Sequence, residues 1–293
     1  MEDYNQIFLG QDGNKILSDI PDNFSKYFDW QITRSKIFKK TDIPRTIYLK
    51  TDFLPLFVNI TLPKINNQFI LITACSDYSP EINFNKQYNI LINHSKLKFW
   101  FMNNMKTKNE KSFSLPCGLG AGRFWNNCTP KEIDDIIIKI RNSVNNDNKI
   151  TNKIFCCFRE AYFNVCGNDM FIRPAISKIV NKNKDLFDIY EPDSMNFETF
   201  IKTLSRYKYS LCPHGNGMDP SPTCWLSLAV NTIPVIYRIP NTIDMFNEID
   251  SVIFFDNFED ITNKNIYIDK SYIDFDFLTC KYWSNMINSK IQN

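Results

Sequence analysis

The residue types best suited to chemistry are concentrated in one loop, Cys212-Pro213-His214-Gly215-Asn216-Gly217-Met218-Asp219-Pro220-Ser221. It follows an apolar segment that is typical of a buried strand, and it ends in Ser221-Pro222, a pair expected at the start of a helix. Glycines let the backbone approach a ligand closely, and the N–H groups at a helix start attract anions. The loop therefore predicts a phosphate-binding site, with an ordinary glycine-containing turn between strand and helix as the alternative.

The elements around this loop should place it at the edge of a sheet. From residue 150 onward, strand-like and helix-like segments alternate, which favours parallel strands joined by helices. The expected strands are 153–158, 186–190, 209–212 and 233–237, and the expected helices are 169–180, 197–207, 222–230 and 277–290. Ligands of such sheets bind beyond the carboxyl ends of the strands, where the loop would lie.

The first half of the chain has a sheet-like pattern of its own. Its apolar segments 46–49, 69–74 and 89–92 are interpreted as strands. A glycine-containing stretch, 118–122, and an expected helix, 130–144, come next, with Thr129 as the N-cap of that helix. The polar tract 145–148 is the predicted linker. We therefore expect two α/β domains, 1–145 and 150–293, with the C-terminal helix docked by its apolar face.

The overall composition excludes several classes of protein. With 34 basic and 32 acidic residues, the chain has no general charge that would attract nucleic acid. No apolar run is long enough to span a bilayer, and residues 1–10 lack the apolar segment of a signal peptide. Only two histidines and no CxxC pair argue against zinc. The sequence predicts a cytoplasmic protein, and its excess of Asn, Ile and Lys suggests an AT-rich genome, for example that of a large DNA virus acting in the host cytoplasm.

Two stretches of the sequence carry a resemblance to a known family. One is the loop from Cys212 to Asp219, followed by Trp225 and by Asn231-Thr232-Ile233-Pro234-Val235-Ile236. The other is His94-Ser95-Lys96-Leu97-Lys98-Phe99-Trp100-Phe101-Met102-Asn103-Asn104, followed by Phe113-Ser114-Leu115-Pro116-Cys117-Gly118-Leu119. Together they resemble the exostosin-like and fucosyltransferase-like enzymes of the GT-B type, over roughly residues 70–236. That resemblance implies two Rossmann-like domains facing each other across a cleft.

The resemblance also implies an activity. It is that of a glycosyltransferase that moves a hexosyl or deoxyhexosyl group from a UDP- or GDP-linked donor to a hydroxyl of a glycan or protein acceptor, with inversion, without a metal and without another cofactor. The sequence departs from the family pattern around Trp225, because Pro222 and Thr223 stand where relatives often have an Arg. Leu226 stands where they have a Glu suited to the ribose. A catalytically inactive GT-B-like module that binds a glycan or a protein is therefore the alternative.

By the same resemblance, the loop residues receive roles. Gly215, Asn216 and Gly217 would line the donor diphosphate through their N–H groups, and Ser221 at the helix start would complete the anion site. Asp219 would accept hydrogen bonds from sugar hydroxyls, or else act as a second cap of the helix.

Four further side chains complete the predicted site. His214 would donate to a phosphate oxygen or stabilise the turn. Arg159 and Arg173 would each neutralise the leaving diphosphate, with a surface salt bridge as the alternative. Asp77 follows the strand 69–74 and is the predicted general base, or else a turn residue before Pro80. No metal site is expected, since the Asp-x-Asp at 274–276 follows most of the α/β pattern.

Overall fold

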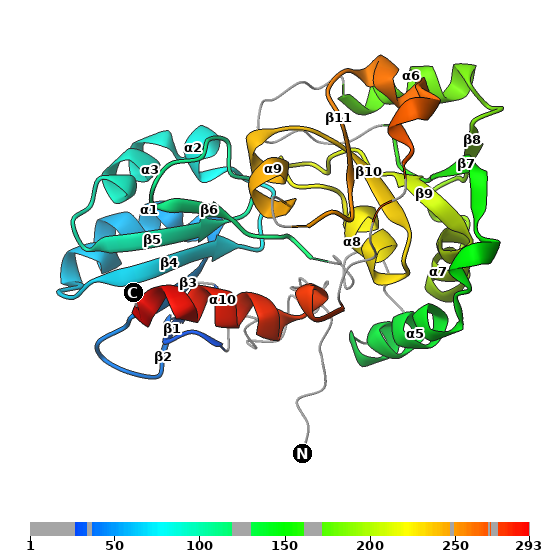
Figure 1. The fold of residues 1–293 in the computed structure, drawn as a ribbon. Helices are drawn as coiled ribbons and strands as arrows, with labels where there is room; N and C mark the ends of the chain where they lie inside the picture. The colour runs from blue at the N-terminus through cyan, green and yellow to red at the C-terminus, as the bar shows by residue number, and fades with distance from the viewer. Residues whose placement is uncertain are drawn as a thin grey trace.

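Two parallel-stranded sheets stand side by side in the protein (Figure 1). The computed structural model describes residues 27–33, 37–118, 130–160, 172–246, 249–268, 270 and 275–292. The first sheet, in the order β2-β1-β3-β4-β5-β6, contains β1 (Trp30–Ile32), β2 (Ile37–Lys39), β3 (Thr46–Lys50), β4 (Phe69–Ala74), β5 (Leu97–Met102) and β6 (Ser112–Ser114). Its strand pairs are parallel except for the antiparallel β1–β2 pair.

The second sheet is parallel in every pair. In the order β11-β10-β9-β7-β8 it contains β7 (Ile150–Cys156), β8 (Phe187–Ile189), β9 (Tyr207–Leu211), β10 (Ile233–Tyr237) and β11 (Ile253–Phe255). Parallel strands need crossover connections, and helices supply most of them here. The expected α/β class, with two Rossmann-like parallel-stranded sheets, is confirmed.

Helices cover both faces of the sheets. The first half has α1 (Leu54–Leu56), α2 (Pro80–Asn83) and α3 (Asn85–Ile92), and the rest of the chain has α5 (Pro130–Ser143), α6 (Ile172–Lys182), α7 (Phe197–Ser205), α8 (Pro222–Ala229), α9 (Pro240–Phe246), the 3-10 helix η8 (Phe275–Leu278) and α10 (Cys280–Gln292). No helix of the described ranges is both long and apolar enough to cross a membrane.

One expected strand was wrong. Residues 89–92 form the end of α3 and not a strand. The reason is the spacing of the apolar residues before them, because Phe84, Tyr88 and Leu91 fall on one helical face and pack on the outer side of the first sheet. The strand that follows β4 in the sheet is β5 instead.

Three apolar cores hold these layers together. One lies on the outer face of the first sheet and one on the outer face of the second. The third is continuous between the halves, since it contains Ile72 and Phe101 of the first sheet together with Phe155 and Ile236 of the second. The two halves therefore share buried apolar surface and are not merely joined by a linker.

Two helices cross or approach the junction between the halves. α5 precedes the expected linker at 145–148, yet it packs against α7, and Arg141 donates to the carbonyl oxygens of Leu228 and Ala229 at the end of α8 at 3.2 and 3.0 Å. α10 runs back beneath the first sheet, as expected for the C-terminal helix (Figure 1). Its Lys290 ammonium lies 5.7 Å from the ring centre of Phe113 in β6.

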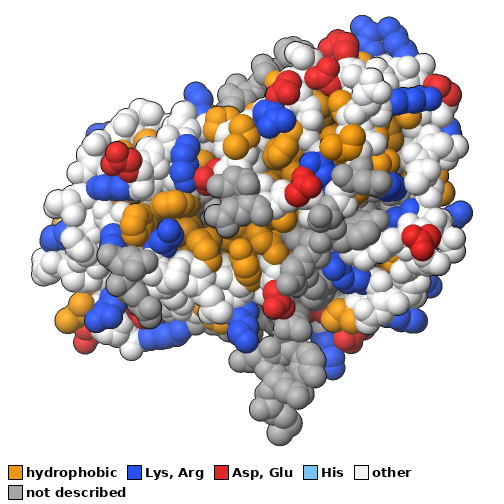
Figure 2. Space-filling model, viewed as in Figure 1, with side chains coloured by type: hydrophobic (Ala, Val, Ile, Leu, Met, Phe, Trp, Pro, Cys, Tyr) orange, Lys and Arg blue, Asp and Glu red, His pale blue; other side chains and the backbone are white. Residues whose placement is uncertain are grey.

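Some expectations fall on residues outside the described ranges. These are the chain start at 1–10, the cap Thr129, most of the glycine-containing stretch at 118–122, and the first residues of the helix expected at 169–180. On the face shown in Figure 2, charged side chains of both signs are interspersed around a central group of hydrophobic ones.

Candidate active site

Loops at the carboxyl ends of strands from both sheets meet at the junction. Asp77 follows β4, Asn104 follows β5, and the loop 213–221 follows β9. The amide Nδ2 of Asn216 donates to Oδ2 of Asp77 across the junction at 3.2 Å. Carboxyl ends of parallel strands are where α/β proteins bind ligands. The predicted base and the predicted donor loop therefore lie next to each other.

The loop 213–221 is closed on itself. His214 and Pro220 form an antiparallel bridge, and the N–H of Gly215 donates to the carbonyl of Asp219 at 3.2 Å. Ser221 occupies the N-cap position of α8, as its sequence predicts, but its side chain makes no capping hydrogen bond. The loop thus leaves the start of α8 without a side-chain cap from Ser221.

Asn104 joins the first half to this loop through three hydrogen bonds. Its Oδ1 accepts from the N–H of Met218 at 2.6 Å and from the N–H of Asp219 at 3.0 Å. Its own N–H donates to Oδ1 of Asp219 at 2.9 Å, and its Nδ2 donates to the carbonyl of Ser76 at 2.9 Å. Its φ of 54° lies in the left-handed region, which Asn tolerates better than most residues. Asn104 ends the second stretch that carries the family resemblance, but no role was predicted for it.

The two glycines of the loop have different surroundings. A Cβ built on Gly217 would lie 2.1 Å from Oδ1 and 2.6 Å from Cγ of Asn104, whereas a Cβ on Gly215 would meet nothing within 4 Å. Only position 217 therefore excludes a side chain, and the group that excludes it belongs to the protein itself.

Asp219 is a buried carboxyl with one satisfied oxygen. Oδ1 accepts from the Asn104 N–H and, at 2.7 Å, from Nδ2 of Asn241. Oδ2 is buried and has no hydrogen-bond partner among the residues that the structure describes. Burial raises the pKa of Asp219 to about 7, with the nearby Asp77 carboxylate acting in the same direction. The group is therefore partly protonated at neutral pH, and carboxyls with strongly shifted pKa values are frequent at functional sites.

His214 is buried as well, and neither ring nitrogen forms a hydrogen bond with any residue of the described ranges. Its ring packs edge-on against Tyr237, with 6.2 Å between the ring centres. Burial lowers the pKa of His214 to about 4, although backbone groups of Met218 and Asp219 nearby act in the opposite direction. The imidazole is therefore neutral at pH 7.

The two candidate arginines differ in their surroundings. The Nε of Arg173 donates to the carbonyl of His214 at 2.7 Å, and its Nη1 donates to the carbonyl of Arg159 at 3.2 Å. Arg173 thus brings a positive charge to the loop. The guanidinium of Arg159 is more than half exposed and forms a salt bridge with Asp193, which is the alternative stated for it above.

A chain of polar groups beyond the predicted residues completes the junction. Asn241, at the start of α9, donates to Asp219, and its Oδ1 accepts from the hydroxyl of Ser114 at 2.7 Å. Asp244 accepts from the N–H of Ser114 at 2.7 Å. The sequence analysis predicted neither α9 nor a role in the site for Asn241 and Asp244, because no local motif indicates either. Within the described ranges, no cluster of three or more His, Cys, Asp or Glu side chains could hold a metal.

Comparison with known proteins gives distant structural likenesses. No protein-family model and no curated protein matches the sequence. An apo structure of OtsA is similar over 85% of this chain and 73% of its own, with 8% identity and a TM-score of 0.43. A crystal structure of a glycosyltransferase from Rickettsia africae ESF-5 is similar over 85% of this chain and 65% of its own, with 12% identity and a TM-score of 0.32. Since neither TM-score reaches 0.5, the functional assignment depends on the site.

Proposed function

We propose that the protein is a glycosyltransferase that takes its sugar from a UDP- or GDP-linked donor. The observation that carries the proposal is the meeting of Asp77, from the first sheet, with the loop 213–221, from the second. Two-substrate transfer needs a donor site and an acceptor-side base held next to each other. The family resemblance of the loop supports the same assignment.

The donor diphosphate would bind at the loop and the start of α8. Gly215, Met218 and Asp219 use their N–H groups for hydrogen bonds within the protein, so Asn216 and Gly217 are the loop residues that would offer theirs. Pro222, the first residue of α8, has no N–H, and the N–H of Cys224 donates to the carbonyl of Ser221 at 2.9 Å, so the helix start would add the N–H of Thr223 and a positive dipole. Arg173 would supply the positive charge that stabilises the leaving diphosphate.

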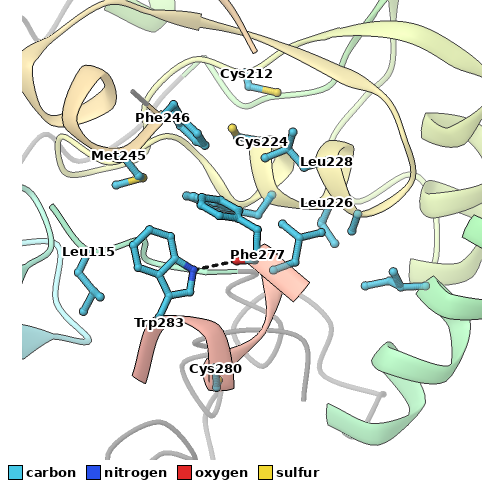
Figure 3. Close-up of a cluster of buried hydrophobic side chains, with 14 of the residues drawn as sticks. Leu115, Cys212, Cys224, Leu226, Leu228, Met245, Phe246, Phe277, Cys280 and Trp283 are labelled. Atoms are coloured by element: carbon cyan, nitrogen blue, oxygen red, sulfur yellow. Dashed lines mark hydrogen bonds between the residues drawn. The ribbon is translucent and has the colours of Figure 1, made fainter. Parts of the chain in front are cut away.

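The ribose contact of the related enzymes would not come from position 226. Leu226 is 2% exposed and belongs to the shared core (Figure 3). A residue buried there cannot reach a ligand. The donor's ribose would therefore be held by another group, and this difference separates the protein from the usual pattern.

Asp77 would act as the general base for an inverting transfer. It lies in the loop after β4, on the side of the first half, and its Oδ2 contacts Asn216 of the donor loop. A base in that position would take the proton from the acceptor hydroxyl while the diphosphate leaves on the other side. Asp219 is less suited to that step because it is buried behind Asn104 and Asn241.

Nucleotide binding is tested by thermal unfolding with UDP, GDP and their sugar derivatives, with and without a divalent metal. A ligand at about 100 times its dissociation constant stabilises the native state by about 2.7 kcal/mol. We expect one nucleotide to raise the unfolding temperature without metal. If no nucleotide does, the proposal is wrong and the inactive binding module becomes the better assignment.

Catalysis is tested with the nucleotide-sugar that binds. Asp77→Asn should keep the thermal shift and lower donor turnover by roughly 10²- to 10⁴-fold, because it removes the base and keeps the contact to Asn216. Asp193→Asn, on the exposed partner of Arg159, is the control and should leave turnover unchanged. Wild-type turnover in the Asp77→Asn variant would exclude Asp77 as the base.

A further inference from the structure

Gly217 and Asn104 are complementary in shape across the junction. The side-chain amide of Asn104 occupies the place that a side chain on Gly217 would take. Its Cγ, Oδ1 and Nδ2 would all lie within 2.8 Å of a Cβ added to Gly217. No ligand is needed to explain why this position lacks a side chain. At Gly215, a Cβ would have no atom of the described residues within 4 Å, so no such demand exists there.

The hydrogen bonds between the two segments are reciprocal. The side-chain Oδ1 of Asn104 accepts from two consecutive N–H groups of the loop, and the backbone N–H of Asn104 donates back to Oδ1 of Asp219. Two consecutive N–H groups that converge on one oxygen fix the direction of the backbone between them. The loop therefore takes its shape from a residue of the other half.

The backbone on the side of Asn104 is also special. Both Cys75, with φ 58°, and Asn104, with φ 54°, follow neighbouring strands in left-handed conformations. Such conformations cost free energy in residues with side chains and persist only where the surrounding contacts hold them. The Asn104 amide is held by Ser76 on one side and by the loop on the other.

We infer that Asn104 is a positioning residue that seats the loop 213–221 from the first half, and that position 217 is glycine in order to admit the Asn104 amide. Closure of the two halves and assembly of the loop are then one event. This placement of the loop by Asn104, called the seat below, does not depend on the reaction, whereas its consequence for nucleotide binding rests on the proposed function.

Substitutions that enlarge position 217 and shrink position 104, a size exchange, test whether the two residues are complementary in shape. Gly217→Ala should lower the unfolding temperature by about 5 °C or more, because its Cβ overlaps the amide. The matched control Gly215→Ala should change it by less than about 2 °C.

The reciprocal variant Asn104→Gly removes the amide and tolerates the positive φ. In the double variant the overlap disappears, so the loss should be clearly smaller than the sum of the single losses. Additive losses, or equal effects at 215 and 217, would overturn the inference.

Hydrogen exchange tests the seating of the loop directly. In Asn104→Gly, the amides of Met218 and Asp219 should exchange roughly tenfold faster than in the wild type, because they lose their acceptor. Amides in β10 should keep their rates. Unchanged exchange at both loop amides would show that the loop holds its shape without Asn104.

Nucleotide titration separates the seat from the function. Whichever of UDP or GDP stabilises the wild type should stabilise Asn104→Gly at least tenfold more weakly in apparent dissociation constant, since the loop must be ordered on binding. Equal affinity together with faster exchange would refute the link between seat and nucleotide site. If neither nucleotide stabilises the wild type, the proposed function fails, while the size exchange and the exchange rates still decide on the seat.

Discussion

Two sets of contacts join the halves of the protein, one made of apolar side chains and one made of hydrogen-bonded polar groups, called here the apolar seam and the polar seam. The apolar seam consists of Leu115, Phe246, Phe277 and Trp283, which Figure 3 shows in the shared core, together with Trp225 of the same core. The polar seam consists of Asn104, Ser114, Asp219, Asn241 and Asp244, which are linked by hydrogen bonds. This difference indicates that the apolar contacts stabilise the association of the two halves and that the polar contacts fix their relative alignment.

The apolar seam stabilises without strong directional demands. Trp225 stacks on Phe246 with ring centres 5.2 Å apart, and Trp283 donates its indole N–H to the carbonyl of Phe277 at 2.9 Å. Burial of such large side chains contributes several kcal/mol in total. The polar seam gains little net free energy, because each hydrogen bond replaces one to water. Its hydrogen bonds instead define one register between the two sheets.

The largest effect is expected from breaking the apolar seam. Trp283→Ala should lower the free energy of unfolding by about 3–5 kcal/mol, because it leaves a cavity between α10 and the core. Denaturant unfolding measures this loss. Lys281→Ala, two residues earlier on the exposed side of α10, should change stability by less than about 0.5 kcal/mol. Equal effects of the two variants would mean that α10 does not hold the halves together.

A smaller effect, and one of opposite sign, is expected in the polar seam at Asp219. Its pKa is raised to about 7, so between about pH 4 and pH 7 the folded state holds the proton that the unfolded chain has released. The free energy of unfolding therefore falls by up to about 4 kcal/mol as the pH rises through that window. Asp219→Asn keeps the Oδ1 acceptor and removes the charge.

The test is unfolding of wild type and Asp219→Asn at pH 5 and pH 8. The variant should be the more stable protein at pH 8, and its advantage should shrink at pH 5. A variant that loses stability at pH 8 would show that the ionised carboxylate is satisfied by partners in solution, contrary to the unpartnered Oδ2.

The smallest effect is expected at His214, in the acid range. Its pKa is lowered to about 4, so the folded state stays neutral while the unfolded chain takes up a proton below about pH 6.5. This group alone should lower the free energy of unfolding by up to about 3 kcal/mol as the pH falls from 6.5 to 4, against the opposite contribution of Asp219. His214→Phe keeps the ring against Tyr237 and cannot take up that proton. Relative to the wild type, the variant should therefore gain up to about 3 kcal/mol in free energy of unfolding between pH 6.5 and pH 4, in addition to the stabilisation that protonation of Asp219 gives both proteins. A constant difference between the two proteins across this window would assign the acid dependence to other groups.

Much of the fold was predictable because its signals are local. The apolar runs at β4 and β10 are long enough and uniform enough to indicate buried parallel strands, and both strands have the predicted bounds, Phe69–Ala74 and Ile233–Tyr237. Ser221-Pro222 predicted the first turn of α8. The short run at 89–92 was ambiguous, since four apolar residues fit a strand as well as the end of an amphipathic helix.

The candidate site was predictable only in part. Local patterns were enough to predict the type of sheet, the loop after β9 and the helix that follows it, because propensity and hydrophobic period act over a few neighbouring residues. The folded structure was needed to show that Asn104 fills the space beside Gly217, since the two are more than a hundred residues apart. It also decided the protonation of Asp219 and His214, because a pKa depends on burial and on groups brought together by folding.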